Sequence, residues 1–161
     1  MNKRIEKIIS IINSENLDAI AIIPGSNFKF FTGGDFALME RPTVLFIFKD
    51  RKPLVILPTL KVDSFEKLDF NADIIEWQDS DGYQDAFNKA KNKIGEIKKI
   101  GVEGQRMRYF EYKAIQTSFN SSEILDVNKI IMSCRICKDK NEVSSLQKAI
   151  DISEKSLKKV L

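Results

Sequence analysis

Short apolar runs alternate along this chain with segments in which apolar residues recur every three to four positions, and this alternation restricts the possible folds more than any other feature. Six runs are short, rich in β-branched residues and bounded by turn residues, as strands are. They are 18–23, 43–48, 54–57, 73–77, 98–103 and 123–127. The segments with helical periodicity are 2–15, 60–68, 82–97, 108–119 and 139–161. The pattern predicts an α/β domain, three-layer-like, in which helices flank a mixed sheet of about six strands.

The runs at 43–48 and 54–57 are almost continuously apolar and are separated by the charged sequence K-D-R-K-P. They predict a β-hairpin whose strands are buried on both faces. Two other segments are less regular. The stretch 26–35 follows a Pro-Gly turn, is rich in phenylalanine and reaches a pair of glycines, so we expect a loop there. We expect residues 130–132 to form the extended exit from the last strand.

The length of 161 residues suits a single domain, which can bury roughly two-thirds of its unfolded surface. No apolar run approaches the ~20 residues that a membrane-spanning helix needs. The first residues, M-N-K-R, lead into an amphipathic repeat and not into the apolar centre of a signal peptide. We therefore expect a cytoplasmic protein with no membrane partner.

Histidine is absent from the sequence, and its absence excludes several classes of enzyme. Ser-His-Asp and Cys-His mechanisms need that side chain, and so do imidazole-containing metal sites. Glycine-rich phosphate loops and the G-x-S-x-G nucleophile motif are missing as well. The net charge of +3 is spread along the chain, without the basic stripe of a nucleic-acid-binding protein. The residues alone thus argue against a catalytic domain and against a nucleic-acid partner.

The two cysteines, Cys134 and Cys137, form a C-R-I-C sequence that has three interpretations. A redox pair would follow a strand at a helix N-terminus, where the pKa of a thiol is lowered. A zinc site needs four ligands, and the chain has no further cysteine and no histidine to complete one. Free cysteines are commonly small buried side chains. We favour this structural role, with one thiol packed inward, the other at the edge, and no bond between them.

The last segment is the clearest helix. Asp139 and Glu142 have the spacing of a capping box. The apolar residues that follow share a stripe about 120° wide on one side of the helix. They are Val143, Leu146, Ala149, Ile150, Leu157, Val160 and Leu161. No glycine or proline ends the pattern, so we expect the natural sequence to continue past it.

Three short sequences resemble motifs of one protein family. The sequence N-F-K-F-F-T-G at 27–33 resembles the N-x-x-Y-L-T-G motif in the N-terminal domain of the creatinase, prolidase and Xaa-Pro aminopeptidase family. The sequence I-G-V-E at 100–103 is similar to a strand of that domain. Residues 135–149 resemble the R-x-I-K-x-x-x-E-I-x-x-[IL]-x-x-A passage into the catalytic domain. The chain departs from these motifs at F-F, where Tyr-Leu is usual, and at Cys137, where isoleucine is common.

The resemblance extends over essentially the whole chain and implies a creatinase-type N-terminal domain at 1–133, with ribonuclease H-like topology. Residues 134–161 would be the connector and first helix of a catalytic domain that is absent from this chain. In the family, that pita-bread domain is a hydrolase in which two Asp, one His and two Glu bind a pair of divalent ions, manganese, cobalt or zinc. Nothing in this chain matches those ligands. The resemblance therefore implies that the chain binds no metal and is not catalytic by itself.

Two functions remain open. In the first, the chain is the auxiliary domain of a proline-specific metallo-aminopeptidase or dipeptidase, where it forms a homodimer and shapes the access of peptide substrates to the metal site of the missing domain. In the second, it belongs to a non-catalytic protein-binding module, because the pita-bread family also includes a histone chaperone subunit. Five metal ligands in the sequence that follows would indicate the peptidase, which we favour.

Five residues are candidates for the substrate-access loop, namely Asn27, Phe31, Thr32, Asp35 and Arg41. The resemblance places this loop near the cleft, and an arginine can bind a substrate carboxylate through two hydrogen bonds. The alternative is structural. Asn27 would then cap a turn, the phenylalanines would belong to the core, and Arg41 would be a solvated surface charge.

Overall fold

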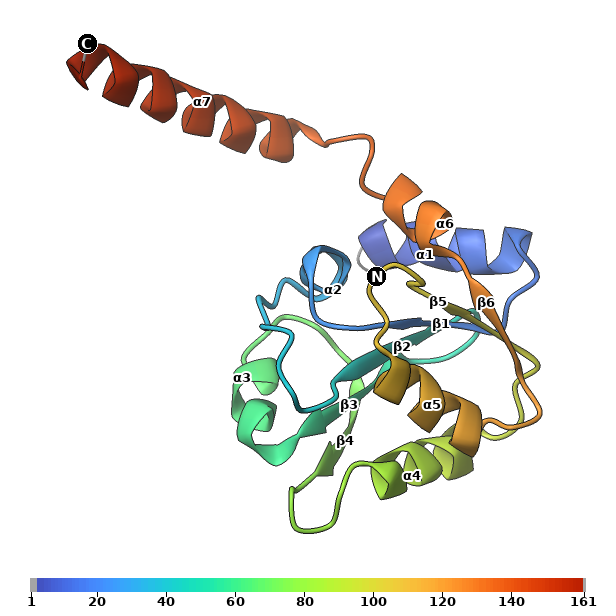
Figure 1. Cartoon of the computed structure of the whole chain (residues 1–161). Helices are drawn as coiled ribbons and strands as arrows, with labels where there is room; N and C mark the ends of the chain where they lie inside the picture. Colours follow the sequence, from blue (N-terminus) through green and yellow to red (C-terminus); the bar gives the residue numbers. More distant parts are fainter. Residues whose placement is uncertain (1–2, 161) are drawn as a thin grey trace.

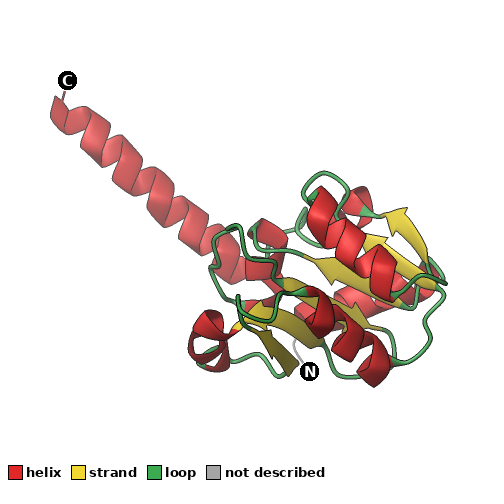
Figure 2. Ribbon diagram, turned by 60° about the horizontal axis from the view of Figure 1, so that its bottom comes forward, coloured by secondary structure: helices red, strands yellow, loops and turns green. Residues whose placement is uncertain are grey.

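The computed structural model describes residues 3–160 and contains a six-stranded mixed sheet with helices on both faces (Figures 1 and 2). The strands are β1 (Ala19–Ile22), β2 (Val44–Phe48), β3 (Leu54–Pro58), β4 (Asp73–Trp77), β5 (Lys99–Val102) and β6 (Glu123–Asp126). The helices are α1 (Lys3–Ser14), α2 (Ser26–Thr32), the 3-10 turn η1 (Thr59–Lys61), α3 (Val62–Glu66), α4 (Gln84–Ile94), α5 (Tyr109–Ser118), α6 (Asn128–Ser133) and α7 (Lys140–Val160). Residue 2 of the predicted first helix and Leu161 of the predicted stripe lie outside the described residues.

The sheet has the strand order β4-β3-β2-β1-β5-β6. The predicted hairpin β2–β3 is antiparallel, and β2 also pairs antiparallel with β1. The strands that arrive through helical crossovers, β4, β5 and β6, pair in parallel with their neighbours. Every residue of β2 and β3 is buried, because helices cover both sides of the hairpin. The prediction of a mixed α/β sheet with about six strands is confirmed.

The two faces of the sheet carry separate apolar cores. Helices α4 and α5 cover one face, and α1, α2, α3 and α6 cover the other (Figure 1). Alternate residues of strand β1 contribute to the two cores. Ala19 and Ala21 point to the first core, and Ile20 and Ile22 point to the second. The result is the three-layer arrangement that the alternation predicts.

Helix α1 attaches to the sheet through the isoleucine stripe that the sequence shows. Ile5, Ile8 and Ile12 are at most 5% exposed, and Ile9 packs partly buried beside them. Burying three isoleucine side chains contributes roughly 5–9 kcal/mol before conformational entropy is subtracted. This burial fixes α1 against the strands at the start of the chain.

The segment 26–32 is a helix, so the prediction of a loop was wrong there. Phe28 and Phe31 are one turn apart and both face the core, which gives α2 a buried side. Gly33 ends the helix in the left-handed conformation, with φ of 79°, and donates its N–H to the carbonyl of Lys29 at 2.8 Å. The aromatic residues and the glycine that suggested a loop are therefore the buried face and the stop signal of a short helix. The residues that follow α2, 33–43, have no regular secondary structure and are called the 33–43 loop below.

Residues 130–132 also differ from the prediction, because they belong to helix α6 and not to an extended exit. Asp126 Oδ1 accepts the N–H of Asn128 at 2.9 Å and turns the chain into the helix directly after β6. Helix α6 then buries Ile131 in the same core as α1. The tertiary contact, more than the local apolar pattern, decides the conformation here.

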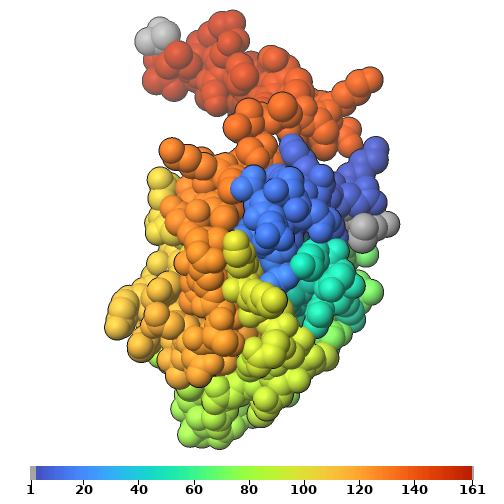
Figure 3. All heavy atoms as spheres, turned by 90° about the vertical axis from the view of Figure 1, so that its right-hand side faces the viewer, coloured from blue at the N-terminus to red at the C-terminus, as the bar shows by residue number. Residues whose placement is uncertain are grey.

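Helix α7 extends away from the rest of the domain (Figures 1 and 3). The predicted capping box is present, since Asp139 Oδ1 accepts the N–H of Glu142 at 2.8 Å and Glu142 Oε2 accepts the N–H of Asp139 at 2.9 Å. No residue of α7 is buried, and its apolar stripe is open to solvent. Among residues 3–160, neither α7 nor a shorter helix has the length and apolar content needed to cross a membrane.

Candidate functional site

The five candidate residues of the access loop lie in two environments. Asn27, Phe31 and Thr32 are on α2 and are at most 5% exposed. Asp35 and Arg41 lie in the 33–43 loop and reach the surface. Each of the five has different partners, so they do not form one cluster in this chain.

Phe31 packs α2 against the core, and Thr32 forms hydrogen bonds at the end of α2 where the 33–43 loop begins. The ring of Phe31 lies within the core beside α1 and packs edge-on against Phe30, with 5.1 Å between the ring centres. Thr32 Oγ1 donates to the carbonyl of Phe28 at 2.8 Å and accepts the N–H of Gly34 at 3.0 Å. Both side chains are directed inward. Their assignment to substrate access stays a prediction.

Arg41 is paired with carboxylates of its own chain. Its Nε donates to both oxygens of Asp79, at 2.9 and 3.0 Å, and its NH1 donates to Glu40 at 2.6 Å. The hydrogen bond to Asp79 raises the pKa of Arg41 and lowers the pKa of Asp79. A substrate carboxylate would have to replace Asp79 in this fork. Asp35, the other exposed candidate, pairs with Lys29 at 2.7 Å.

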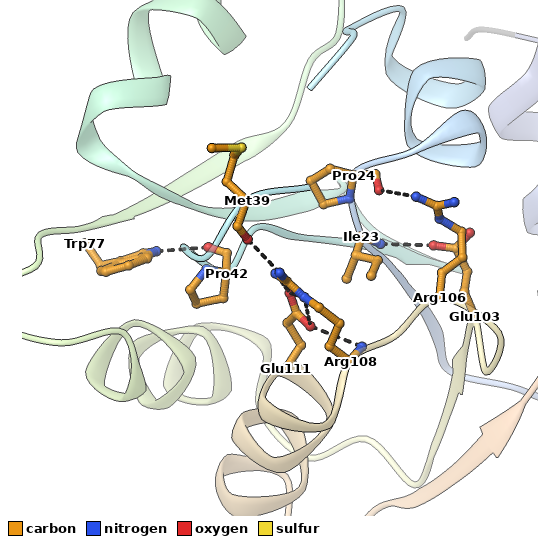
Figure 4. A network of polar contacts seen from close by, with 9 residues as sticks. All are labelled: Ile23, Pro24, Met39, Pro42, Trp77, Glu103, Arg106, Arg108 and Glu111. Atoms are coloured by element: carbon orange, nitrogen blue, oxygen red, sulfur yellow. Dashed lines mark hydrogen bonds and ion pairs between the residues drawn. The ribbon is translucent and has the colours of Figure 1, made fainter. Parts of the chain in front are cut away.

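The 33–43 loop is anchored to the domain by two residues that no sequence motif singles out (Figure 4). Arg108 NH1 donates to the carbonyl of Met39 at 2.7 Å, and Trp77 Nε1 donates to the carbonyl of Pro42 at 3.2 Å. The same guanidinium forms an ion pair with Glu111, which is fully buried. These contacts fix the middle and the end of the loop relative to α5 and β4.

One local signal could have identified Arg108 and Glu111 in advance. They are three residues apart at the start of the predicted 108–119 helix, which is a spacing at which opposite charges on a helix can pair. In the structure Glu111 Oε2 accepts the N–H of Arg108 at 3.2 Å. The link from Arg108 to Met39 has no such local signal, because 69 residues separate the two.

A second polar centre lies where β1 and β5 end side by side. Glu103, in the I-G-V-E sequence, is fully buried. Its Oε2 accepts the N–H of Ile23 at 3.0 Å, and its Oε1 accepts the amide N–H of Asn27 at 2.6 Å. Burial raises the pKa of Glu103, although these hydrogen bonds and the nearby Arg106 and Arg135 favour the charged form.

Arg106 closes this centre on its other side. Its NH2 donates to the carbonyl of Pro24 at 3.2 Å (Figure 4). A side chain at Gly25 would collide with the guanidinium, since a Cβ built there would lie 2.6 Å from Arg106 NH2. The arginine side chain can shift, so the stronger requirement for glycine is the φ of 153° at Gly25, which residues with a side chain rarely adopt.

The sequence matches the family model of the Creatinase/Prolidase N-terminal domain over residues 4–137. The chain belongs to this family. The resemblance carried by the three short sequence motifs is confirmed.

Curated relatives of this creatinase-type domain are longer than the chain. An uncharacterized peptidase of Staphylococcus aureus (strain bovine RF122 / ET3-1) is 28% identical over 154 residues, which are 96% of this chain and 42% of that protein. The corresponding protein of strain USA300 has the same identity and coverage. The chain spans about two-fifths of the length of these relatives.

Solved structures share the fold at lower sequence identity. A proline dipeptidase from Streptococcus pneumoniae TIGR4 superposes with a TM-score of 0.73 at 23% identity, over 83% of this chain and 98% of that one. A prolidase from Thermococcus sibiricus superposes with a TM-score of 0.86 at 23% identity, over 97% of this chain and 42% of that one. A dipeptidase from Pyrococcus horikoshii OT3 gives 0.84 at 21% identity, over 98% and 43%.

The creatinase-type domain has no group of side chains suited to a metal ion. Within residues 3–160, no three His, Cys, Asp or Glu side chains are close enough together to hold one. Cys134 is buried and Cys137 is exposed, as predicted for one thiol packed inward and the other at the edge, and both are free. Cys134 lies at the C-terminus of α6, and burial raises the pKa of its thiol. Both facts are opposite to what a reactive thiolate needs.

Proposed function

We propose that this chain is the non-catalytic N-terminal domain of a proline-specific metallopeptidase, an Xaa-Pro aminopeptidase or dipeptidase. The observation that carries the proposal is the superposition on the Thermococcus sibiricus prolidase, which includes 97% of this chain and leaves more than half of the prolidase without a counterpart. The family match ends at residue 137, just before α7. This supports a division between a domain at 1–133 and a connector and helix at 134–161.

The residues of the chain support a non-catalytic role. Hydrolysis by a pair of divalent ions requires a cluster of side-chain ligands that holds both metals close together. The sequence contains no histidine, and the described residues contain no suitable cluster. A manganese, cobalt or zinc pair therefore does not fit this chain, and the proposal assigns it to a C-terminal domain.

The proposed contribution of this domain is to dimerisation and to substrate access. The anchored 33–43 loop supports the second role, because Trp77 and Arg108 hold it in a defined position while Arg41 remains at the surface. In this proposal Arg41 exchanges Asp79 for a substrate carboxylate. The open apolar stripe of α7 supports a role in association.

The test uses the polypeptide in which this chain is followed by the proposed catalytic domain. Xaa-Pro dipeptides and Xaa-Pro-Yaa tripeptides are incubated with the protein, with manganese, cobalt or zinc and after chelation. We expect metal-dependent release of the N-terminal residue by that polypeptide and none by the 161-residue chain. Activity of the short chain, or inactivity of the long one with all three metals, would contradict the proposal. Inactivity combined with missing metal ligands would indicate the protein-binding module.

The access role has its own prediction. Arg41→Ala in the active polypeptide should raise KM and leave the metal content unchanged, because the guanidinium that binds the substrate carboxylate is lost. Arg51→Ala serves as the control, since Arg51 also pairs with a surface carboxylate, Asp50, but lies outside the 33–43 loop and has no proposed substrate contact. Equal kinetics for Arg41→Ala and the parent would remove Arg41 from the substrate site.

A further inference from the structure

One asparagine, Asn27, links its own segment to two others that are far away in the sequence. Asn27, at the start of α2, donates its amide N–H to Glu103 Oε1 at 2.6 Å. Its amide oxygen accepts a hydrogen bond from Arg135 NH1 at 3.0 Å. These partners are 76 and 108 residues away in the sequence. Each of the three residues comes from a different one of the three family-like motifs.

The chemistry of the two partners explains why an asparagine stands between them. An ionised carboxylate only accepts hydrogen bonds, and a guanidinium only donates them. The amide of Asn27 can satisfy both at once, because it donates through nitrogen and accepts through oxygen. The other oxygen of Glu103 is occupied by the N–H of Ile23. Neither aspartate nor leucine at position 27 could make both contacts.

The hydrogen bonds of Asn27 and Glu103 constrain one another, because both side chains are buried. Glu103 is 0% exposed and Asn27 is 3% exposed. A buried polar group that loses its partner keeps the full penalty of desolvation. In the described part of the chain, no buried side-chain nitrogen or oxygen lacks a partner. The Asn27 side chain is therefore positioned by Glu103, whose other oxygen is held by Ile23, and the Asn27 amide oxygen faces Arg135.

Arg135 lies in the segment that joins α6 to α7, residues 134–139, which is called the connector below. Two further contacts reach the connector and the start of α7 from helix α1. Lys7 Nζ donates to the carbonyl of Cys134 at 3.0 Å, and Arg4 pairs with Glu142 at 2.9 Å. Ion pairs that are screened by water hold their partners only weakly. The bond from Arg135 joins the connector to Asn27, a side chain that is itself buried and held by Glu103.

We propose that Asn27, Glu103 and Arg135 are positioning residues that fix the direction in which α7 leaves the domain. Helix α7 has 21 residues and so acts as a lever about 30 Å long, which enlarges any rotation at its start. A free six-residue connector would have a root-mean-square span of ~13 Å and would leave that direction undefined. The proposal goes beyond the peptidase function and does not depend on it. It concerns the geometry of this chain alone.

The direction of α7 can be measured by pulsed electron paramagnetic resonance. One nitroxide label is placed on α4 through Lys89→Cys and the other on α7 through Lys155→Cys, both at exposed positions. Cys137→Ser removes the exposed native thiol, and the buried Cys134 is left in place. Dilution with unlabelled protein removes distances between molecules. We expect one narrow distance population for the parent.

Arg135→Met removes the bond to Asn27 and keeps the contacts of Asn27 and Ile23 with Glu103. It should make the distance distribution at least about twice as wide, because the connector gains the freedom of a flexible chain. Arg51→Met is the matched control, since Arg51 also donates to a partner distant in the sequence, the carbonyl of Ile94, but has no contact with the connector. Its distribution should stay as narrow as the parent's.

Widening in Arg135→Met but not in Arg51→Met supports the proposal. A distribution equal to the parent's in Arg135→Met overturns it, as does equal widening in both variants or a broad distribution in the parent. Failure of Arg135→Met to fold also overturns it, because Arg135 would then be part of the folding core. None of these measurements involves hydrolysis, so their outcome is separate from that of the peptidase assay.

Discussion

Two carboxylates are set apart from the other acidic residues of the domain by complete burial. Glu103 and Glu111 are both 0% exposed, and each is held by specific donors. Glu103 accepts hydrogen bonds from Ile23 and Asn27, and Glu111 forms an ion pair with Arg108. Because buried polar groups must stay paired, single substitutions around them should have measurable effects.

Glu103 should make stability depend on pH in a definite direction. Its pKa is raised above the ordinary value of 4.5, chiefly by burial, so the folded state holds the proton to a higher pH than the unfolded state does. Its stabilising contribution is complete below the unfolded pKa and is lost as the pH rises through the folded pKa. We expect the free energy of unfolding of the parent, minus that of Glu103→Gln, to fall as the pH rises from 4.5. Urea denaturation across this range measures the difference, and a difference that grows with pH would contradict the prediction.

Two arginines near the 33–43 loop allow a matched comparison of buried and exposed ion pairs. Arg108→Met leaves the buried carboxylate of Glu111 without its charged partner, which should cost about 3–5 kcal/mol. Arg41→Met removes an exposed pair with Asp79, and we expect little change in stability. Chemical denaturation of both variants tests this. Similar losses for the two would show that the burial of Glu111 is not what matters.

At the scale of elements, glycine geometry decides where α2 ends. Gly33 has φ of 79°, and no atom lies within 4 Å of where its Cβ would stand. The conformation of the backbone is therefore the constraint, and not the space around it. Helix α2 ends at Gly33 because glycine adopts left-handed backbone angles, which most L-residues avoid.

Gly33→Ala should lower the free energy of unfolding by about 1–2 kcal/mol, because alanine is strained in the left-handed region. Gly33→Asn should lower it less, since asparagine tolerates that region better. Thermal or chemical unfolding of the two variants measures the difference. Equal losses would point to a cause other than backbone strain.

At the scale of the whole molecule, the apolar stripe of α7 stands out because its side chains are exposed to solvent. Five of its residues are about half exposed or more, namely Val143, Leu146, Ile150, Leu157 and Val160. Together they exceed the apolar patch that monomers usually leave open. Two copies of the stripe could cover each other around a two-fold axis, the commonest symmetry of oligomers. Homodimer formation stays a prediction.

Light scattering of the purified chain should give the mass of a dimer. Ile150→Lys places a charge within the stripe and should produce a monomer, because burial of a lysine charge in a paired interface is unfavourable. Ile152→Lys is the matched control, since Ile152 is also exposed but lies outside the stripe. A parent that is monomeric, or that dissociates equally with both substitutions, would rule out pairing through this stripe.

The sequence by itself determined the parts of this protein that depend on near neighbours. The apolar periodicities predicted the hairpin, the helices that flank the sheet and the stripe of α1, because burial on one side of an element repeats with its own period. The capping box of α7 was predictable for the same reason, since Asp139 and Glu142 are within one turn. The three family-like motifs identified the family before any contact was known.

Only the tertiary structure decided which partners the candidate site residues contact. Residues 26–32 and 130–132 form helices because Phe28, Phe31 and Ile131 gain burial against the sheet, and a local pattern cannot show that gain. Asn27 appeared to be part of a loop, yet its partners Glu103 and Arg135 are 76 and 108 residues away. A hydrogen bond depends on distances in space that the folded core alone creates. Which polar residues meet in this domain is therefore set by how its sheet and helices pack together.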